Sequence, residues 1–263
     1  MRNCHDTVGP GVEVIDRPAS CFGDRRSGAQ IELVVIHYTA MENSEAALER
    51  LCGSEFEVSA HYLVGRDGTV FRMVREDQRA WHAGAGSWGG RGDVNSRSIG
   101  IELDNDGTTR FTEPLMEKLE VLLADILDRH VLPPRAVIGH SDMAPGRKRD
   151  PGRHFDWRRL AEKGLSVWPA PLSGGDFMRD AAAFGYPVHE GKNAILSAFR
   201  QRFNPDGSGP LSTDDEALMP GLARGFPAEV LCGQSGASVP CLICLVVVKR
   251  KDLRIFRNLL AVD

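Results

Sequence analysis

The 263-residue sequence has no apolar run long enough to cross a bilayer, and its charges nearly balance. The longest apolar run, residues 239–248, is about half the roughly 20 residues that a membrane-spanning helix needs. The net charge of −4 gives no electrostatic case for binding nucleic acid or an anionic membrane. The first residues lack the apolar segment of a signal peptide. We therefore predict a cytoplasmic protein, or one of the cell envelope if the true start lies upstream.

Several signatures of catalysis and of disulfide scaffolds are also missing. The six cysteines are scattered, and Cys241-x-x-Cys244 alone is weak evidence for metal or redox chemistry. The sequence has no GxSxG elbow, which disfavours a serine nucleophile. It also has no HExxH motif, so the zincin signature gives no support for a zinc site. The GxGxxG match at residues 84–89 neither follows an apolar strand nor opens a helix, so we do not expect a dinucleotide site.

Short apolar and alternating runs predict the strands. Buried strands are expected over residues 31–39, 98–104 and 135–140. Residues 59–73 have two alternating halves around Asp67-Gly68, a pair typical of tight turns, and so predict a hairpin. The stretch 141–157 is rich in proline, glycine and charge and is expected to be a loop.

Helical patterns lie between these strands. Ser44 is the expected N-cap of a short helix over residues 45–52, and Thr112 caps a longer one. The longer helix carries an apolar face of Leu115, Leu119, Leu122, Leu123 and Ile126. Interspersed strands and helices predict an α/β fold, in which a mixed central β-sheet is flanked by helices and followed by a small all-α domain.

Composition divides the chain into three predicted parts. Residues 169–176 are rich in proline, glycine and serine and indicate a linker. We predict a catalytic domain at 1–170 and a small helical domain at 171–227. The tail at 228–263 has an apolar run followed by basic residues and no clear pattern, so we assign it no structure.

Five residues suggest metal-dependent hydrolysis. His37 and His140 are predicted at strand ends, and Asp150 lies in the loop ten residues after His140. Two histidines and one carboxylate would leave a fourth tetrahedral position on zinc open for water. Glu102 would serve as the general base, and Lys148 would stabilise an oxyanion. Spacing alone is not specific, because a lone histidine at a strand end is more often structural.

The ordered motifs are more specific. VVIHYTA, VSAHYLVGRDGTV, WHAG, SRSIGIELD and IGHSDMAPGRKRDPG occur at spacings that resemble the N-acetylmuramoyl-L-alanine amidase family, which includes peptidoglycan recognition proteins. The resemblance covers residues 11–168. It implies a zinc site of His37, His140 and Asp150, with Glu102 and Lys148 as the catalytic pair. Its implied reaction is attack of zinc-bound water on the amide between N-acetylmuramic acid, or its anhydro form, and L-alanine.

The same resemblance bears on the substrate and on the second domain. With an aspartate as the third ligand, the chain resembles the bacterial amidases that act on muropeptides. Ala60 stands where phage relatives commonly carry tyrosine, so no catalytic tyrosine is implied. The helical segment resembles a peptidoglycan-binding domain. We expect a monomer whose partner is peptidoglycan or a muropeptide. Five further residues are expected to contact that substrate, namely His61, Trp81, His82, Asn95 and Arg97.

Two alternatives remain at this stage. A non-catalytic peptidoglycan sensor on the same fold would typically lack one or more ligands, whereas all three are present here. A zinc peptidase would keep the metal and cut within the stem peptide instead. Groove shape would distinguish these bonds, and the sequence does not reveal it.

Overall fold

The computed structural model describes residue 9 and residues 11–228. Of the predicted tail at 228–263, residues 229–263, which include Cys241 and Cys244, lie outside the described residues. Among the residues that are described, no helix is both long and apolar enough to cross a membrane. The helices are α1 (Ser44–Cys52), α2 (Glu113–Arg129), α3 (His140–Met143), α4 (Trp157–Glu162), α5 (Phe177–Phe184), α6 (Lys192–Phe203) and α7 (Thr213–Gly225).

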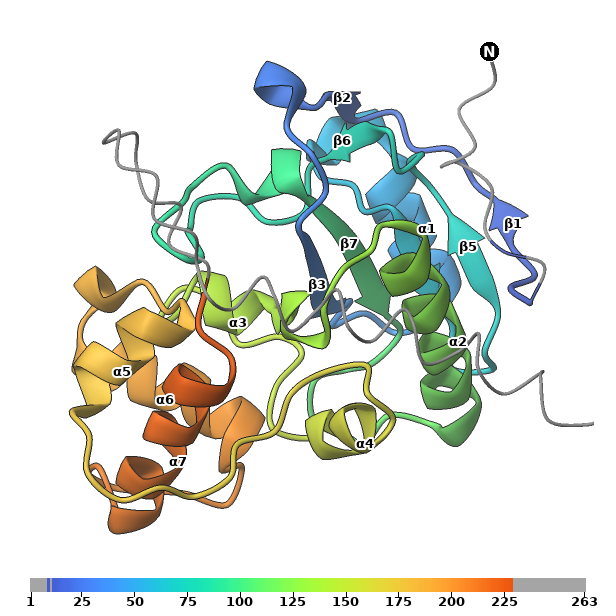
Figure 1. Cartoon of the computed structure of the whole chain (residues 1–263). Coiled ribbons are helices and arrows are strands. Elements are labelled where there is room, and N and C mark those ends of the chain that lie inside the picture. Colours follow the sequence, from blue (N-terminus) through green and yellow to red (C-terminus); the bar gives the residue numbers. More distant parts are fainter. Residues whose placement is uncertain (1–8, 10, 229–263) are drawn as a thin grey trace, which may run out of the picture. The chain divides into compact units, whose positions relative to one another are not determined.

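A six-stranded mixed sheet forms the centre of the described fold (Figure 1), which confirms the predicted fold class. Its order is β1-β5-β4-β7-β3-β8, and only the β4–β5 pair is antiparallel. A separate antiparallel pair joins β2 and β6. The strands are β1 (Ile15–Asp16), β2 (Phe22–Asp24), β3 (Leu33–Tyr38), β4 (Tyr62–Val64), β5 (Val70–Arg72), β6 (Gln78–Ala80), β7 (Ser98–Leu103) and β8 (Val137–Gly139).

The two faces of the sheet bury different sets of helices. Because side chains alternate along a strand, Val34 and Ile36 of β3 point to one face, and Leu33 and Val35 point to the other. The first face packs on the apolar side of α2 and on α4. The second face shares a core with α3, α5, α6 and α7 near β3 and β8. Helix α1 covers β4 in a third cluster.

Local expectations are mostly confirmed, with corrections at element ends. Helix α1 begins at Ser44 rather than after it, and Asn43 is the N-cap, whose Oδ1 accepts from Ala46 N at 3.0 Å. The Ser44 hydroxyl instead donates to Asp104 at 2.7 Å. Strand β8 stops at Gly139, so His140 begins helix α3 instead of ending a strand. The predicted loop at 141–157 therefore starts with most of one helical turn.

Three helices follow the predicted linker. They match the apolar segments that predicted a helical region after residue 176. Their buried side chains belong to the same core as Leu33, Val35 and Ile138 of the sheet. The predicted boundaries at 170 and 227 stay a prediction, because shared packing does not decide where a domain that folds by itself begins.

Candidate metal centre

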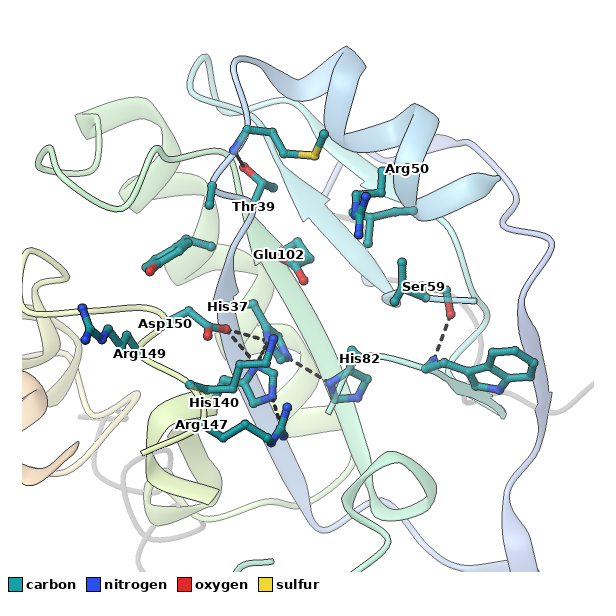
Figure 2. Close-up of a pocket in the computed structure, with 17 residues that line it drawn as sticks. His37, Thr39, Arg50, Ser59, His82, Glu102, His140, Arg147, Arg149 and Asp150 are labelled. Carbon is teal, nitrogen blue, oxygen red and sulfur yellow. Dashed lines mark hydrogen bonds and ion pairs between the residues drawn. The ribbon is translucent and has the colours of Figure 1, made fainter. Parts of the chain in front are cut away.

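Strands β3 and β7 bring a histidine and a carboxylate to one face of the sheet. The strands are parallel neighbours, and His37 pairs with Glu102 in their register. The alternation that buries Val34 and Ile36 on the α2 face turns His37 to the opposite face. Glu102 is turned the same way, because Ile101 and Leu103 point toward α2. Figure 2 shows both side chains along the wall of one pocket.

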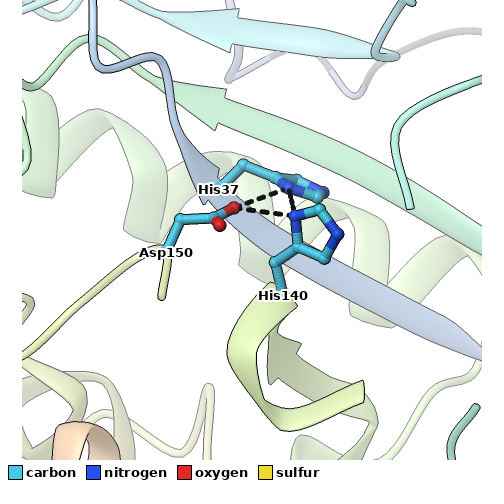
Figure 3. A group of neighbouring side chains, drawn as sticks. All are labelled: His37, His140 and Asp150. Carbon is cyan, nitrogen blue, oxygen red and sulfur yellow. Dashed lines mark hydrogen bonds and ion pairs between the residues drawn. The ribbon is translucent and has the colours of Figure 1, made fainter. Parts of the chain in front are cut away.

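Three predicted ligands converge beside this pair (Figure 3). Nδ1 of His37 lies 2.9 Å from Nδ1 of His140 and 3.0 Å from Oδ2 of Asp150. The His140 to Asp150 distance is 2.9 Å, and all three residues are buried. A tetrahedral zinc with ligand bonds near 2.0–2.1 Å separates its ligand atoms by about 3.3 Å. The donor set and its spacing therefore fit such an ion.

The other ring nitrogen of each histidine has a partner within the protein. Nε2 of His140 lies 2.9 Å from the Ala83 carbonyl oxygen, which can only accept, so the proton is on Nε2. Nε2 of His37 lies 2.9 Å from Nδ1 of His82. A proton on each Nε2 leaves both Nδ1 lone pairs directed toward the Asp150 carboxylate, where a cation would bind.

Burial sets the protonation states in this cluster. Burial first, and the neighbouring His140 second, lower the pKa of His37 to about 4 against the opposing effect of Asp150. Burial alone would raise the pKa of Asp150, but its close contacts with His140 and His37 outweigh burial and hold that pKa well below the ordinary value. A neutral imidazole at His37 and an ionised carboxylate are the forms that a metal ion requires.

Glu102 has a different environment from Asp150. Its Oε2 atom is buried and has no hydrogen-bond partner among the described residues. Burial raises the pKa of Glu102 well above the ordinary value, and the negative charge of Asp150 raises it further, against an opposing effect of Lys148. A carboxyl with a raised pKa and a free oxygen facing a pocket has the properties of a general base or acid.

The pocket itself has a volume of about 450 Å³. It contains the three candidate ligands together with Glu102 and Lys148, so the structure brings all five predicted residues to one cavity. Two of the predicted substrate-contact residues, Trp81 and His82, also line it. Nε1 of Trp81 is buried and has no hydrogen-bond partner among the described residues.

The remaining predicted contact residues lie behind the pocket wall. His61 is fully buried and accepts from the Gly100 backbone at 2.9 Å. Asn95 Oδ1 accepts from the backbone nitrogens of His82 and Ala83. Arg97 donates to the Trp88 carbonyl at 2.8 Å. These side chains shape the loop that carries His82, and none of the three lines the cavity.

Sequence reasoning missed three arginines that line the same cavity, Arg50, Arg147 and Arg149. Arg147 and Arg149 flank Lys148 in the chain, so the charge run GRKRD was an available signal. Arg147 donates to the Ala83 carbonyl oxygen at 2.7 Å. The same oxygen accepts from Nε2 of His140. Arg50 comes from α1, and no local pattern distinguishes it from a solvated helix residue.

Comparisons with known proteins connect this site to a family. Residues 27–153, which include all five residues, match the family model described as N-acetylmuramoyl-L-alanine amidase. The chain is 31% identical over 234 residues to N-acetylmuramoyl-L-alanine amidase AmiD of Escherichia coli K12, covering 75% of this chain and 84% of AmiD. It is 45% identical over 103 residues to 1,6-anhydro-N-acetylmuramyl-L-alanine amidase AmpD of Enterobacter cloacae, covering 39% of this chain and 55% of AmpD.

Solved structures agree. AmiD of E. coli, in complex with anhydro-N-acetylmuramic acid-L-Ala-D-γ-Glu-L-Lys, has a TM-score of 0.69 at 30% identity, covering 76% of this chain and 91% of that one. AmpDh3 of Pseudomonas aeruginosa has a TM-score of 0.68 at 27% identity, and the match covers 84% of this chain and 98% of AmpDh3. Fold and site are thus those of an amidase with a His-His-Asp cluster suited to a metal ion. The chain belongs to the N-acetylmuramoyl-L-alanine amidase family.

Proposed function

We propose that this chain is a zinc-dependent amidase that separates muramic acid from the L-alanine of its stem peptide. His37, His140 and Asp150 would hold the ion, which when bound would lower the pKa of a water molecule and polarise the amide carbonyl. The observation that supports this most is the convergence of three ligand atoms within 3.0 Å in the pocket that Glu102 also lines. One oxygen of that carboxyl has no partner among the described residues.

Glu102 and Lys148 would supply the proton transfer and the charge stabilisation. Glu102 takes the proton from the attacking water and returns it to the departing amine of L-alanine. The raised pKa of this carboxyl suits a group that both takes and returns a proton. Lys148 places its ammonium group beside the amide oxygen as negative charge develops there.

The substrate class follows from the pocket and from two relatives. AmiD and AmpDh3 were each solved with an anhydromuramic peptide. The pocket of this chain combines Trp81, which suits a sugar ring or a peptide group, with Arg50 and Arg149, whose charges suit peptide carboxylates. We therefore propose a muropeptide as substrate, with the lactyl amide lying over the metal centre.

Metal analysis and digestion test this proposal together. Purified full-length protein is expected to contain about one zinc per chain and to release free stem peptide plus intact sugar from defined muropeptides, as read by mass spectrometry. His140→Ala should lose both metal and activity. His154→Ala is the matched control, because His154 is exposed in the same loop and lies outside the cluster.

Each rival gives a different result in the same assay. Binding of muropeptide without cleavage would favour the peptidoglycan sensor. Cleavage within the stem peptide would favour the zinc peptidase. A His140→Ala protein with full activity would remove the proposed metal centre altogether.

Three finer predictions accompany the amidase. Residues 171–227 are proposed to bind peptidoglycan, which cosedimentation of the full chain with insoluble peptidoglycan tests. The monomer is tested by light scattering. The cytoplasmic location is tested by fractionating cells that carry the native gene, and recovery in the envelope fraction would replace it with the alternative.

A further inference from the structure

The turn after helix α5 contacts both chain segments that hold His140 in place. We propose that this helical region positions His140, and that Tyr186 and Arg202 thereby set the metal affinity of the site. The inference rests on the proposed metal centre. It assigns a role in the metal site to residues that the sequence grouped with a separate binding domain.

The first contact passes through Asp142, two residues after His140. Asp142 is fully buried in α3, and its Oδ2 accepts from the Gly139 backbone nitrogen at 2.8 Å. Its Oδ1 accepts from the Tyr186 hydroxyl at 2.8 Å. Its Oδ2 also accepts from Nη1 of Arg202 at 2.6 Å. Two of the partners that fix this carboxylate therefore come from the helical region.

Arg202 holds the chain on both sides of His140. Besides Asp142 after it, Arg202 donates through Nη2 to the Val137 carbonyl of β8 at 2.9 Å. Its guanidinium lies 4.2 Å from the ring centroid of Trp157, and the residue is only 2% exposed. This buried charge fixes the position of β8 relative to α3. Moving either element would leave the Arg202 guanidinium buried without a partner.

The second contact passes through the segment that carries Ala83. The Trp88 ring packs edge-on against Phe184 and Tyr186, at centroid distances of 5.4 and 5.3 Å. The Gly89 backbone nitrogen donates to the Gly185 carbonyl at 2.9 Å. A Cβ on Gly185 would lie 2.7 Å from the Trp88 ring, so the close approach requires glycine.

These contacts meet on one imidazole. Asp142 places the backbone of His140, and the Ala83 carbonyl orients its Nε2. Both supports lead to residues 184–186. Because the His140 ring is held both through its backbone and at Nε2, its Nδ1 atom points in one direction. Less rearrangement of the ring is then needed when a metal ion binds.

A conservative pair of variants separates this role from ordinary stabilisation. Tyr186→Phe keeps the ring packing and removes only the hydroxyl bond to Asp142. Tyr62→Phe is the matched control, because Tyr62 is equally buried and donates to the Glu76 carboxylate at 2.7 Å, on the α2 side of the sheet. Both variants lose one buried tyrosine–carboxylate bond, and only one of these bonds leads to His140.

The measurement is zinc affinity of the full chain by chelator competition, supported by the visible absorption of the Co²⁺-loaded chain. For Tyr186→Phe we expect the zinc dissociation constant to rise about threefold to tenfold, below the 10–100-fold typical of a direct ligand partner. Its Co²⁺ spectrum should shift. Tyr62→Phe should keep the wild-type affinity and spectrum, although its melting temperature falls.

Arg202→Lys gives an independent test, since it keeps a charge beside Asp142 and loses the forked contact to Val137. It should weaken zinc binding in the same way. Wild-type affinity in both Tyr186→Phe and Arg202→Lys would overturn the inference and leave the amidase proposal standing. A wild-type chain that binds no zinc would overturn both.

Discussion

Nε2 of His37 lies 2.9 Å from Nδ1 of His82, and Nε2 of His82 lies 3.1 Å from the Ser98 hydroxyl. That hydroxyl donates to the Val94 carbonyl at 2.6 Å, so its oxygen accepts from His82. The Nδ1 atom of His82 is then free to accept from His37. Both ring nitrogens of His82 are used within the protein, which favours orientation of His37 over polar contact with substrate.

Replacing His82 with alanine should weaken the metal centre. His37 would lose the acceptor that keeps its proton on Nε2, so we expect zinc affinity to fall about tenfold or more in a chelator competition. Ser98→Ala removes a more distant link and should have a smaller effect. Unchanged affinity in His82→Ala would show that the ring of His37 is held by other contacts.

Replacing Glu102 with glutamine should separate catalysis from metal binding. The amide cannot accept a proton, and general acid–base catalysis is worth about 10²–10⁴ in rate, so kcat on a defined muropeptide should fall by that factor. Zinc content should stay at the wild-type level, because Glu102 is not in the ligand cluster. Glu117→Gln, on the exposed side of α2, is the control. Near-normal kcat in Glu102→Gln would assign the base elsewhere.

Lys148→Met tests stabilisation of the oxyanion. Loss of one such donor typically lowers kcat by about 10²–10³, with less change in KM if the contact forms mainly in the transition state. Zinc content serves as the check that Asp150, two residues away, still binds metal. Lys192→Met, at an exposed position, is expected to match wild type. A large rise in KM with unchanged kcat would assign Lys148 to substrate binding instead.

A buried carboxylate far from the cluster should control acid stability. Burial raises the pKa of Glu76, but bonds from Arg129 and His130 outweigh it and lower the pKa from 4.5 to about 2. A pKa depressed in the folded state stabilises it above pH 4.5, and that stability is lost as pH falls toward 2. This lowering of the Glu76 pKa corresponds to roughly 3 kcal/mol of stability.

Urea unfolding of the wild-type protein and of Glu76→Gln, both free of metal, measures the contribution of the Glu76 carboxylate to the free energy of unfolding. At pH 7 the variant should be less stable by a gap that shrinks as pH falls from 4.5 toward 2. Contributions from other carboxylates are shared by both proteins and cancel in the difference. A gap that stays constant between pH 7 and pH 3 would contradict the assigned role of Glu76.

Much of the fold was predictable because its signals are local. Alternating and β-branched runs predicted β3, β7 and the β4–β5 hairpin, and an apolar stripe predicted α2. Element ends were less predictable. Asn43 rather than Ser44 caps α1, because the Ser44 hydroxyl donates to Asp104 instead. His140 starts a helical turn rather than ending a strand, and such one-residue shifts at element ends are the least predictable feature.

The sequence by itself determined the strands and helices and, through its ordered motifs, the five residues expected at a zinc site. Only the tertiary structure decided that His37 and Glu102 lie side by side on adjacent strands and that His82 contacts His37. It also decided that residues 184–186 contact both chain segments that hold His140. Hydrophobic periodicity records which face of each element is buried. Which distant segments then meet depends on how all the buried faces pack together, and no single segment carries that information.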